Sequence, residues 1–551
     1  MASSFQSRNK FDRLLLTSAV AATRFVFRSH YLYDIDSVNF ALGIRRFDPR
    51  VYQPHPPGYF LYISLGRLLN AVLHDANLSL VVLSIVASCG VVLIVYQMTL
   101  EWFGLSAARF AAVLFLLSPL VWFHGTVALA YIIEAFFSAL LGYLCWRNDG
   151  DHWVPVMSSG LILGISAGIR PSSLLLLGPL FLFSLRDATP SRRVASLGVL
   201  FLTLTAWSVP MISASGGVGV YCSSLISLWR LVPSKATVFN STPANSIARA
   251  FTIAIIYVLA FGAASLAPFG AMAQGVSVDA RKKRFTAVWI APALCFFTFI
   301  FLKFVNSGYV LILTAPSCIW LGFWASEWYR NAPCRRPFKL AVIAACALTN
   351  ICIFLLSPLY CSYRSVRRFE AELQELQKAL PQIASERDSL IIGFDSHFLG
   401  YRHAGYYFPG YLTLEYPEVK LLEGTRIFAM QGRDTRLLDG LPLTSCSHFV
   451  LFPLPGSERE YVEYLENFRA KFPRQALQTV RAGDHNFVTG PISELPLLFP
   501  RSAAQSVTAL RHHEVRSVNR SVHRPKGRDT KSMNPQQFAT SSDLGSKLQF
   551  H

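Results

Sequence analysis

The feature that most constrains the fold is a series of long apolar stretches separated by short polar segments. Hydrophobic residues make up 52% of the 551-residue chain and charged residues only 15%. A bilayer core of about 30 Å takes roughly 20 apolar residues in a helix. The chain is too apolar for a soluble enzyme of this size, and we expect a helical membrane protein. Windows of suitable length lie at 77–98, 108–123, 126–146, 195–213, 249–271, 286–302, 308–326 and 339–357.

Two further regions bring the expected total to about eleven spans. Residues 155–185 are interpreted as two short helices broken at Arg170-Pro171, because proline disfavours helical backbone in the residue before it. Segment 12–28 is the weakest span, and we expect its Arg24 to extend toward the interface. No small-residue cleavage site follows this segment, so it is expected to be an uncleaved anchor.

Basic residues in alternate loops predict the orientation in the membrane. By the positive-inside rule, loops rich in Lys and Arg are cytoplasmic. An odd number of spans then places the loop at 30–76, the loop at 214–246 and everything after 358 outside the cytoplasm. The basic residues are Arg8, Lys10, Arg13, Arg147, Arg186, Arg192, Arg193, Arg281, Lys282, Lys283, Arg284, Arg330, Arg335, Arg336 and Lys339.

Three parts of the chain differ in character. Residues 1–357 are expected to form one transmembrane domain whose first outer loop is 30–76. Within 358–500, strand-like runs at 389–395, 426–430 and 448–454 alternate with helical segments at 367–384 and 458–471, which predicts a small α/β domain outside the membrane. Residues 501–551 are poor in apolar residues and are expected to be a disordered basic tail.

The net charge of +19 does not favour a nucleic-acid partner. Much of the excess lies in the cytoplasmic loops and in the basic tail. A solvated tail is the preferred interpretation, and contact with the headgroups of anionic membrane lipids is the alternative. The ten cysteines show no spacing that resembles a metal site.

The densest polar segment follows the first span. It reads YDIDSVNF at 33–40 and continues with QPHPPGY at 53–59. Carboxylates, arginines and a histidine gathered just outside a membrane span indicate a functional site in a chain that is otherwise mostly apolar.

This loop resembles the first external loop of the GT-C glycosyltransferases, especially the protein O-mannosyltransferases and aminoarabinose transferases. Those enzymes carry an acidic pair in a setting like DEVHF and, later, HPPL. Here DSVNF at 36–40 and HPPG at 55–58 occupy the matching places. Ser37 replaces the second acidic residue, and Gly58 replaces the usual leucine.

Later stretches resemble an uncharacterised bacterial branch of the same superfamily. They are AYIIE at 130–134, GISAGIR at 164–170, GY at 308–309 and YRHAGYY at 401–407. The resemblance therefore covers most of residues 30–410. It implies a GT-C-like fold of about eleven transmembrane helices with a small C-terminal α/β extracytoplasmic domain, in the inner (plasma) membrane.

The resemblance also implies an activity. GT-C enzymes transfer a sugar from a polyprenyl-phosphate donor to a lipid, glycan or protein acceptor on the outer side of the membrane, usually with inversion. Such a reaction needs a carboxylate that deprotonates or orients the acceptor, and cations that stabilise the phosphate leaving group. Asp36 matches the family's loop aspartate and is expected to be the general base. Asp34 is the second catalytic candidate, but it has no firm counterpart in the family, and capping a helix at Phe40 onward is the simpler role for it.

Two further polar residues have alternative roles. His55 either holds the loop in place, helped by the two prolines that follow it, or contacts the donor phosphate. Glu134 lies within a span, where an unpaired carboxylate would cost roughly 2.5–3.5 kcal/mol or more. It therefore needs a partner or a wet cavity, and a structural pair with an arginine is weighed equally with substrate binding.

The remaining candidates are cations and aromatic residues. Arg170, beside a helix break, and Lys303, at the outer end of a span, could hold the donor phosphate, although extension to the interface alone explains Lys303. Tyr309 joins them through the resemblance. Arg402 and His403 lie in a tyrosine-rich stretch that could stack on a sugar or form a core, and this choice stays open.

The leading hypothesis is a glycosyltransferase that moves a hexosyl or pentosyl group. One alternative is a flippase or transporter for lipid-linked glycans, which should carry charges at mid-depth along its path, often with repeats. Another is a non-enzymatic structural partner, if Ser37 marks a lost activity. No cofactor is firmly implied, and a divalent cation at the loop carboxylates stays open.

Overall fold

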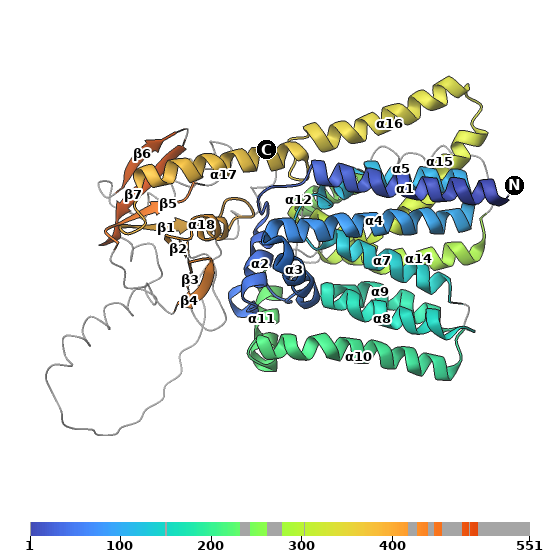
Figure 1. Cartoon of the computed structure of the whole chain (residues 1–551), viewed down its shortest axis with the longest axis horizontal. Coiled ribbons are helices and arrows are strands. Elements are labelled where there is room, and N and C mark those ends of the chain that lie inside the picture. Colours follow the sequence, from blue (N-terminus) through green and yellow to red (C-terminus); the bar gives the residue numbers. More distant parts are fainter. Residues whose placement is uncertain are drawn as a thin grey trace.

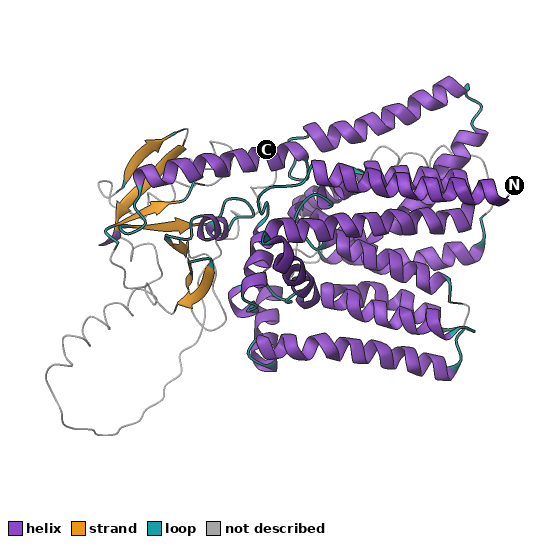
Figure 2. Ribbon diagram, viewed as in Figure 1, coloured by secondary structure: helices purple, strands orange, loops and turns teal. Residues whose placement is uncertain are grey.

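A computed structural model describes residues 2–148, 151–231, 243–261, 278–301, 304–416, 427–438, 446–453, 477–483 and 485–493. Within these ranges a bundle of helices carries a small sheet at one end, and the described strands all gather at that end (Figure 2). The predicted helix at 458–471, the predicted tail and Lys303 lie outside the described residues.

In the described residues before the sheet-bearing region, the structure contains fifteen α-helices. They are α1 (Ala2–Val26), α2 (Ile35–Arg45), α3 (Phe60–Leu73), α4 (Ala76–Phe103), α5 (Leu105–Leu117), α6 (Pro119–His124), α7 (Tyr131–Trp146), α8 (Trp153–Ile169), α9 (Ser172–Leu185), α10 (Pro190–Ala214), α11 (Val218–Leu231), α12 (Pro243–Phe261), α14 (Ala280–Cys295), α15 (Thr314–Asn331) and α16 (Arg336–Leu356).

The chain is a multi-pass helical membrane protein, as its apolar windows predict. Several shorter apolar helices accompany the longest ones, and the total of about eleven spans stays a prediction. Within the described ranges, five helical stretches are long and apolar enough to cross a bilayer: Ala76–Phe103, Pro190–Ala214, Ala280–Ile300, Asn306–Asn331 and Arg336–Leu356.

Prolines decide where several helices break. The predicted break at Arg170-Pro171 is confirmed, because α8 ends at Ile169 and Pro171 is the N-cap of α9. The window 108–123, expected to be one span, is instead divided: α5 ends at Leu117, and α6 starts at Pro119. Proline lacks the N–H that would continue the hydrogen-bond ladder of α5, so the prediction of one continuous helix was wrong here.

Arg24 departs from the expectation that it extends to the interface. Its side chain is fully buried near the end of α1. The guanidinium donates to the Thr23 hydroxyl at 3.0 Å and to the Leu116 carbonyl at 2.9 Å. Leu116 lies in the last turn of α5, where carbonyl groups lack partners within the helix and the helix dipole attracts cations. This acceptor from a neighbouring helix replaces contact with the interface.

The C-terminal part is a small α/β unit. A long helix, α17 (Tyr363–Ile383), leads into it, and α18 (Tyr401–Tyr407) connects two strands. A capping box at Ser362 starts α17, and Phe369, Leu373 and Leu376 lie on its buried face. The strands are β1 (Ser389–Gly393), β2 (Leu412–Glu415), β3 (Ile427–Gln431), β4 (Asp434–Leu438), β5 (His448–Leu451), β6 (Gln478–Ala482) and β7 (His485–Pro491).

These strands form a seven-stranded mixed sheet of order β4-β3-β2-β1-β5-β7-β6. The three central strands, β2, β1 and β5, are parallel, and the outer pairs are antiparallel. The predicted runs at 389–395, 426–430 and 448–454 correspond to β1, β3 and β5. The loop that follows β1 leaves the carboxyl edge of the parallel strands, where ligands of open α/β sheets usually bind.

The first loop lies between the bundle and the sheet, as Figure 1 shows for α2 and α3. Backbone contacts join it to the C-terminal unit. Ile35 N–H donates to the His397 carbonyl at 2.9 Å, and Leu32 N–H donates to the Tyr407 hydroxyl at 2.7 Å. Arg46 donates to the Thr435 carbonyl at 2.7 Å. The loop is therefore tied to the C-terminal unit at three points.

Candidate active site

Asp34 anchors the start of α2. It is the N-cap residue, with φ −108° and ψ 155°, and its carboxylate accepts the Asp36 N–H at 2.8 Å. The same carboxylate accepts the Tyr360 hydroxyl at 2.9 Å and lies 3.8 Å from His397 Nδ1. The capping role expected of Asp34 is confirmed, although the helix begins at Ile35 rather than near Phe40. Asp34 is thus held on three sides.

Asp36 lies in the first turn of α2 and is more open than Asp34. Its side chain is 22% exposed, against 4% for Asp34. One carboxylate oxygen of Asp36 lies 3.3 Å from His55 Nδ1, while the other His55 nitrogen lies 3.2 Å from the Tyr59 hydroxyl. The histidine therefore bridges Asp36 to Tyr59. A carboxylate with one histidine neighbour and partial exposure can still accept a proton from a bound molecule.

The backbone beside His55 explains why this loop departs from HPPL. Gly58 adopts φ 110°, a conformation that residues with a side chain rarely reach. Tyr59 follows with φ 49° as the residue before α3, and its hydroxyl is thereby brought to His55. A leucine at position 58 would be strained in this path, so the glycine is required by the local geometry.

Burial and hydrogen bonding move the pKa values of the two loop carboxylates in opposite directions. Burial raises the pKa of Asp36, and the opposing attraction of His55 and, more weakly, of Arg170 does not cancel it. Burial also acts to raise the pKa of Asp34, but the attraction of His397 and the hydrogen bonds from the Asp36 N–H and Tyr360 outweigh it and lower the pKa. Carboxyl groups with separated pKa values are typical of sites where one group exchanges protons and the other stays ionised.

The two neighbouring histidines also differ. Burial lowers the pKa of His55, so its neutral form is favoured beside Asp36. Burial acts to lower the pKa of His397 too, but the Asp34 carboxylate, with Asp36 and Asp395 behind it, raises it overall. His397 therefore favours its protonated form more than His55 does.

Arg170 forms a second cluster at the end of α8. Its guanidinium donates to Glu134 at 3.1 Å, and Ser173 Oγ donates to the other Glu134 oxygen at 2.7 Å. Both charged side chains are at most 3% exposed. Glu134 was expected either to pair with an arginine or to bind substrate, and in the structure it pairs with Arg170.

Three tyrosines surround the Arg170 guanidinium. The ring of Tyr309 lies 3.8 Å from it, Tyr131 lies 4.5 Å away and Tyr59 lies 6.0 Å away, all within the range of cation–π attraction. A Cβ on Gly308 would overlap the ring of Tyr131, so only glycine allows this close approach. The GY pair at 308–309 therefore brings Tyr309 onto Arg170.

Arg402 and His403 are placed in a core rather than on an open surface. They are 1% and 0% exposed. Arg402 donates to Thr435 Oγ1 at 2.7 Å and to the Val51 carbonyl at 3.0 Å, joining the first loop to β4. His403 packs against Phe369 of α17. Arg402 and His403 are therefore core residues, whereas Tyr406 and Tyr407 of the same stretch are half-buried.

His397 and Asp395 were not identified from the sequence. They lie in the loop after β1, and Asp395 is exposed. The only signal in the sequence was a polar DSH segment directly after a buried strand, and nothing local indicates that it meets Asp34.

His124 is a further residue that the sequence did not single out. It is fully buried at the end of α6, its ring lies 5.0 Å from that of Tyr131, and neither ring nitrogen has a hydrogen-bond partner among the described residues. Within the same described ranges, no group of three or more His, Cys, Asp or Glu side chains is arranged to hold a metal ion.

Comparison with known proteins gives a likeness in structure alone. No protein-family profile and no curated protein sequence matches the chain. The fold is similar to that of ArnT from Cupriavidus metallidurans bound to undecaprenyl phosphate, with a TM-score of 0.57, 13% identity, and coverage of 89% of this chain and 99% of ArnT. For ArnT in the apo state the TM-score is 0.56, the identity 11%, and the coverage 91% and 100%.

A third solved structure is less similar. The apo oligosaccharyltransferase of Archaeoglobus fulgidus has a TM-score of 0.46 and 12% identity, with coverage of 74% of this chain and 64% of that chain. The likeness to ArnT, which extends over nearly the whole of both chains, confirms the predicted GT-C-like fold: a helical membrane bundle with a small C-terminal sheet region.

Proposed function

We propose that this chain is an integral membrane glycosyltransferase that moves a hexosyl or pentosyl group from a polyprenyl-phosphate donor to a lipid, glycan or protein acceptor. The observation that carries the proposal is the pairing of a partly open carboxylate, Asp36, with a buried arginine, Arg170, through Tyr59. His55 lies between Asp36 and the Tyr59 hydroxyl, and the Arg170 guanidinium lies 6.0 Å from the Tyr59 ring. The carboxylate can take the proton of the acceptor, and the arginine can stabilise the anionic leaving group. The shared fold with ArnT, solved with undecaprenyl phosphate, supports the class of donor.

The reaction would proceed as a single displacement with inversion at the anomeric carbon. Asp36 removes the proton of the acceptor hydroxyl or amine as that atom forms a bond to the sugar carbon. The bond from that carbon to the phosphate oxygen breaks, and its electron pair stays on the polyprenyl phosphate. Asp36 later loses the proton to water. These proton and electron transfers are complete without a metal ion, and they are also compatible with a divalent cation that stabilises charge on the phosphate.

Each neighbouring residue then has a defined task. Asp34 stays ionised and holds the start of α2, so that Asp36 keeps its direction. His55 orients the Asp36 carboxylate through one ring nitrogen. Arg170 stabilises charge that develops on the leaving phosphate, and Glu134 and Ser173 fix its guanidinium. Tyr309 covers the arginine and limits its contact with water. Lys303 stays a candidate for the donor phosphate.

We further propose that the transfer takes place on the outer side of the inner (plasma) membrane. Its support is the charge of the loops: the loop that carries Asp36 is on the side opposite to the basic tetrad 281–284. The structure is consistent with this. Lys282 Nζ donates to the Trp102 carbonyl near the last residue of α4, and Asn77, in the first turn of α4, donates to the Ser29 carbonyl just before the Asp36 loop. The tetrad and the loop therefore lie at opposite ends of α4.

A transfer assay tests the proposal. Purified protein in proteoliposomes is given radiolabelled polyprenyl-phosphate pentose or hexose with an envelope extract as acceptor, and the release of polyprenyl phosphate is measured with transferred label. Transfer by the wild type and its loss in Asp36→Asn are expected. Movement of label across the bilayer without cleavage would indicate a flippase instead. Donor binding without either process would indicate a structural partner.

A further inference from the structure

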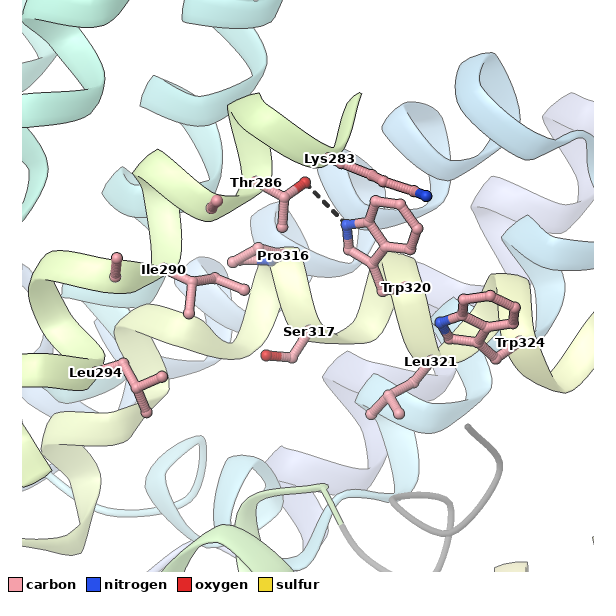
Figure 3. A pocket seen from close by; sticks show the side chains of 11 residues that line it. Lys283, Thr286, Ile290, Leu294, Pro316, Ser317, Trp320, Leu321 and Trp324 are labelled. Atoms are coloured by element: carbon pink, nitrogen blue, oxygen red, sulfur yellow. Dashed lines mark hydrogen bonds between the residues drawn. The ribbon is translucent and has the colours of Figure 1, made fainter. Parts of the chain in front are cut away.

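A groove opens on the side of the bundle between α14 and α15. Its volume is about 560 Å³, and Figure 3 shows the side chains that line it. α14 supplies small and exposed residues, Ala287, Ala291 and Leu294, at intervals that place them on one helix face. α15 supplies two tryptophans opposite them, Trp320 and Trp324. The groove is thus apolar along most of its length.

The wall of the groove is fixed by hydrogen bonds within the protein. Trp320 Nε1 donates to Thr286 Oγ1 at 2.8 Å, and the Thr286 hydroxyl donates to the Lys282 carbonyl at 2.9 Å. The two indole rings lie 6.4 Å apart. The side chains that could collapse into the space are therefore held away from it, and the space needs another occupant in a membrane.

One end of the groove carries positive charge. Lys283 lies in the first turn of α14 and is exposed, and Figure 3 shows it at the same end as Trp324, with Leu294 at the opposite end. Its neighbours are engaged elsewhere: Lys282 donates to the Trp102 carbonyl at 2.9 Å, and Arg281 lies 4.8 Å from the ring of Trp146. In the described part of the chain, Lys283 has no ion-pair partner and Trp324 Nε1 has no hydrogen-bond acceptor.

We propose that this groove binds one phospholipid with an anionic headgroup. One acyl chain lies along Ala287, Ala291 and Leu294, and the headgroup meets Lys283 and the indole N–H of Trp324. Tryptophan and lysine are the side chains that anchor proteins at the level of lipid headgroups. A lysine ammonium adds attraction for an anionic lipid over a zwitterionic one. This site is separate from the Asp36 loop and does not depend on the proposed transfer reaction.

Lipid titration tests the proposal directly. The full chain is delipidated in detergent and titrated with phosphatidylglycerol or phosphatidylcholine, and bound lipid is counted by native mass spectrometry. We expect one retained phosphatidylglycerol and weaker retention of phosphatidylcholine. Ala291→Phe fills the groove and should remove this adduct. Ala206→Phe, at an exposed position of α10 outside the groove, is the matched control and should retain it.

Substitutions of Lys283 separate charge from shape. Lys283→Gln should weaken phosphatidylglycerol binding about fivefold, the factor that corresponds to ~1 kcal/mol for one basic residue near an anionic surface. Phosphatidylcholine binding should not change, and Lys283→Arg should restore the preference. Arg284→Gln, an exposed neighbour that does not line the groove, should have no effect.

Two results would overturn the proposal. Retention of the adduct in folded Ala291→Phe would show that the lipid lies elsewhere. Equal binding of the two lipids, unchanged in Lys283→Gln, would show an apolar groove without headgroup selection. If Ala291→Phe does not fold, the Lys283 series decides alone, because it changes only an exposed side chain.

Discussion

Replacing Asp36 by asparagine should abolish most of the transfer activity while leaving the fold intact. The change keeps the shape of the side chain and removes its charge and basicity. Asp36 makes one contact with His55 at 3.3 Å, and its carboxylate caps no helix, so the structural loss is small. A general base typically contributes about 10²–10⁴-fold to rate, equivalent to roughly 2.7–5.5 kcal/mol of the activation barrier. Donor binding should change little.

Asp34→Asn is the matched comparison. Asparagine is also a good N-cap, but the change removes the charge that accepts the Tyr360 hydroxyl and attracts His397. Hydrogen bonds to charged groups contribute about 1.5–3 kcal/mol, so this variant should lose thermal stability and retain much more of the transfer rate than Asp36→Asn.

The pH profile gives a second measurement of the same prediction. The pKa of Asp36 is raised by burial, so activity should rise with pH as Asp36 ionises, with a midpoint above the ordinary aspartate value of about 3.9. Asp36→Asn should lack this rise. Single-turnover release of polyprenyl phosphate, with donor binding measured separately, provides the rates. Near wild-type transfer by Asp36→Asn, with loss in Asp34→Asn, would refute the assignment of the base; retained activity in both would shift attention to Glu134.

Three further predictions concern donor binding by Arg170, the orientation in the membrane and the charge of His397. Arg170→Ala should weaken donor binding by about 1.5–3 kcal/mol through the loss of a charge-assisted contact, and unchanged affinity in folded protein would exclude a phosphate contact. Lys283→Cys should not react with an impermeant thiol reagent in intact cells, and labelling there would reverse the proposed orientation. His397 has a raised pKa when folded, so its stabilising effect should be complete below its unfolded pKa of about 6.5 and disappear as pH rises through the folded pKa. His397→Gln should therefore lower the Tm near pH 6 and have little effect in alkaline buffer; an equal loss at both pH values would contradict this linkage.

The sequence determined those features that depend on neighbouring residues. The length and apolarity of each window predict a membrane helix because the bilayer constrains every turn of it. Pro171 ends α8 because it disfavours helical backbone in Arg170, and Pro119 separates α6 from α5 because it lacks an N–H. The polar loop at 33–59 was recognised by its composition and by its likeness to a family loop, and three of the strands by their short apolar runs.

Only the tertiary structure decided which distant residues meet. His397 reaches Asp34 because the carboxyl edge of the parallel strands faces the first loop, and no local pattern contains that arrangement. The same packing buries Arg24 against the end of α5 and makes Arg402 a link between loop and sheet. The sequence alone does not show whether a charged residue lies at the membrane interface, in the protein core or in the functional site. Its partners settle the choice, because a buried charge is stable only where packing supplies them.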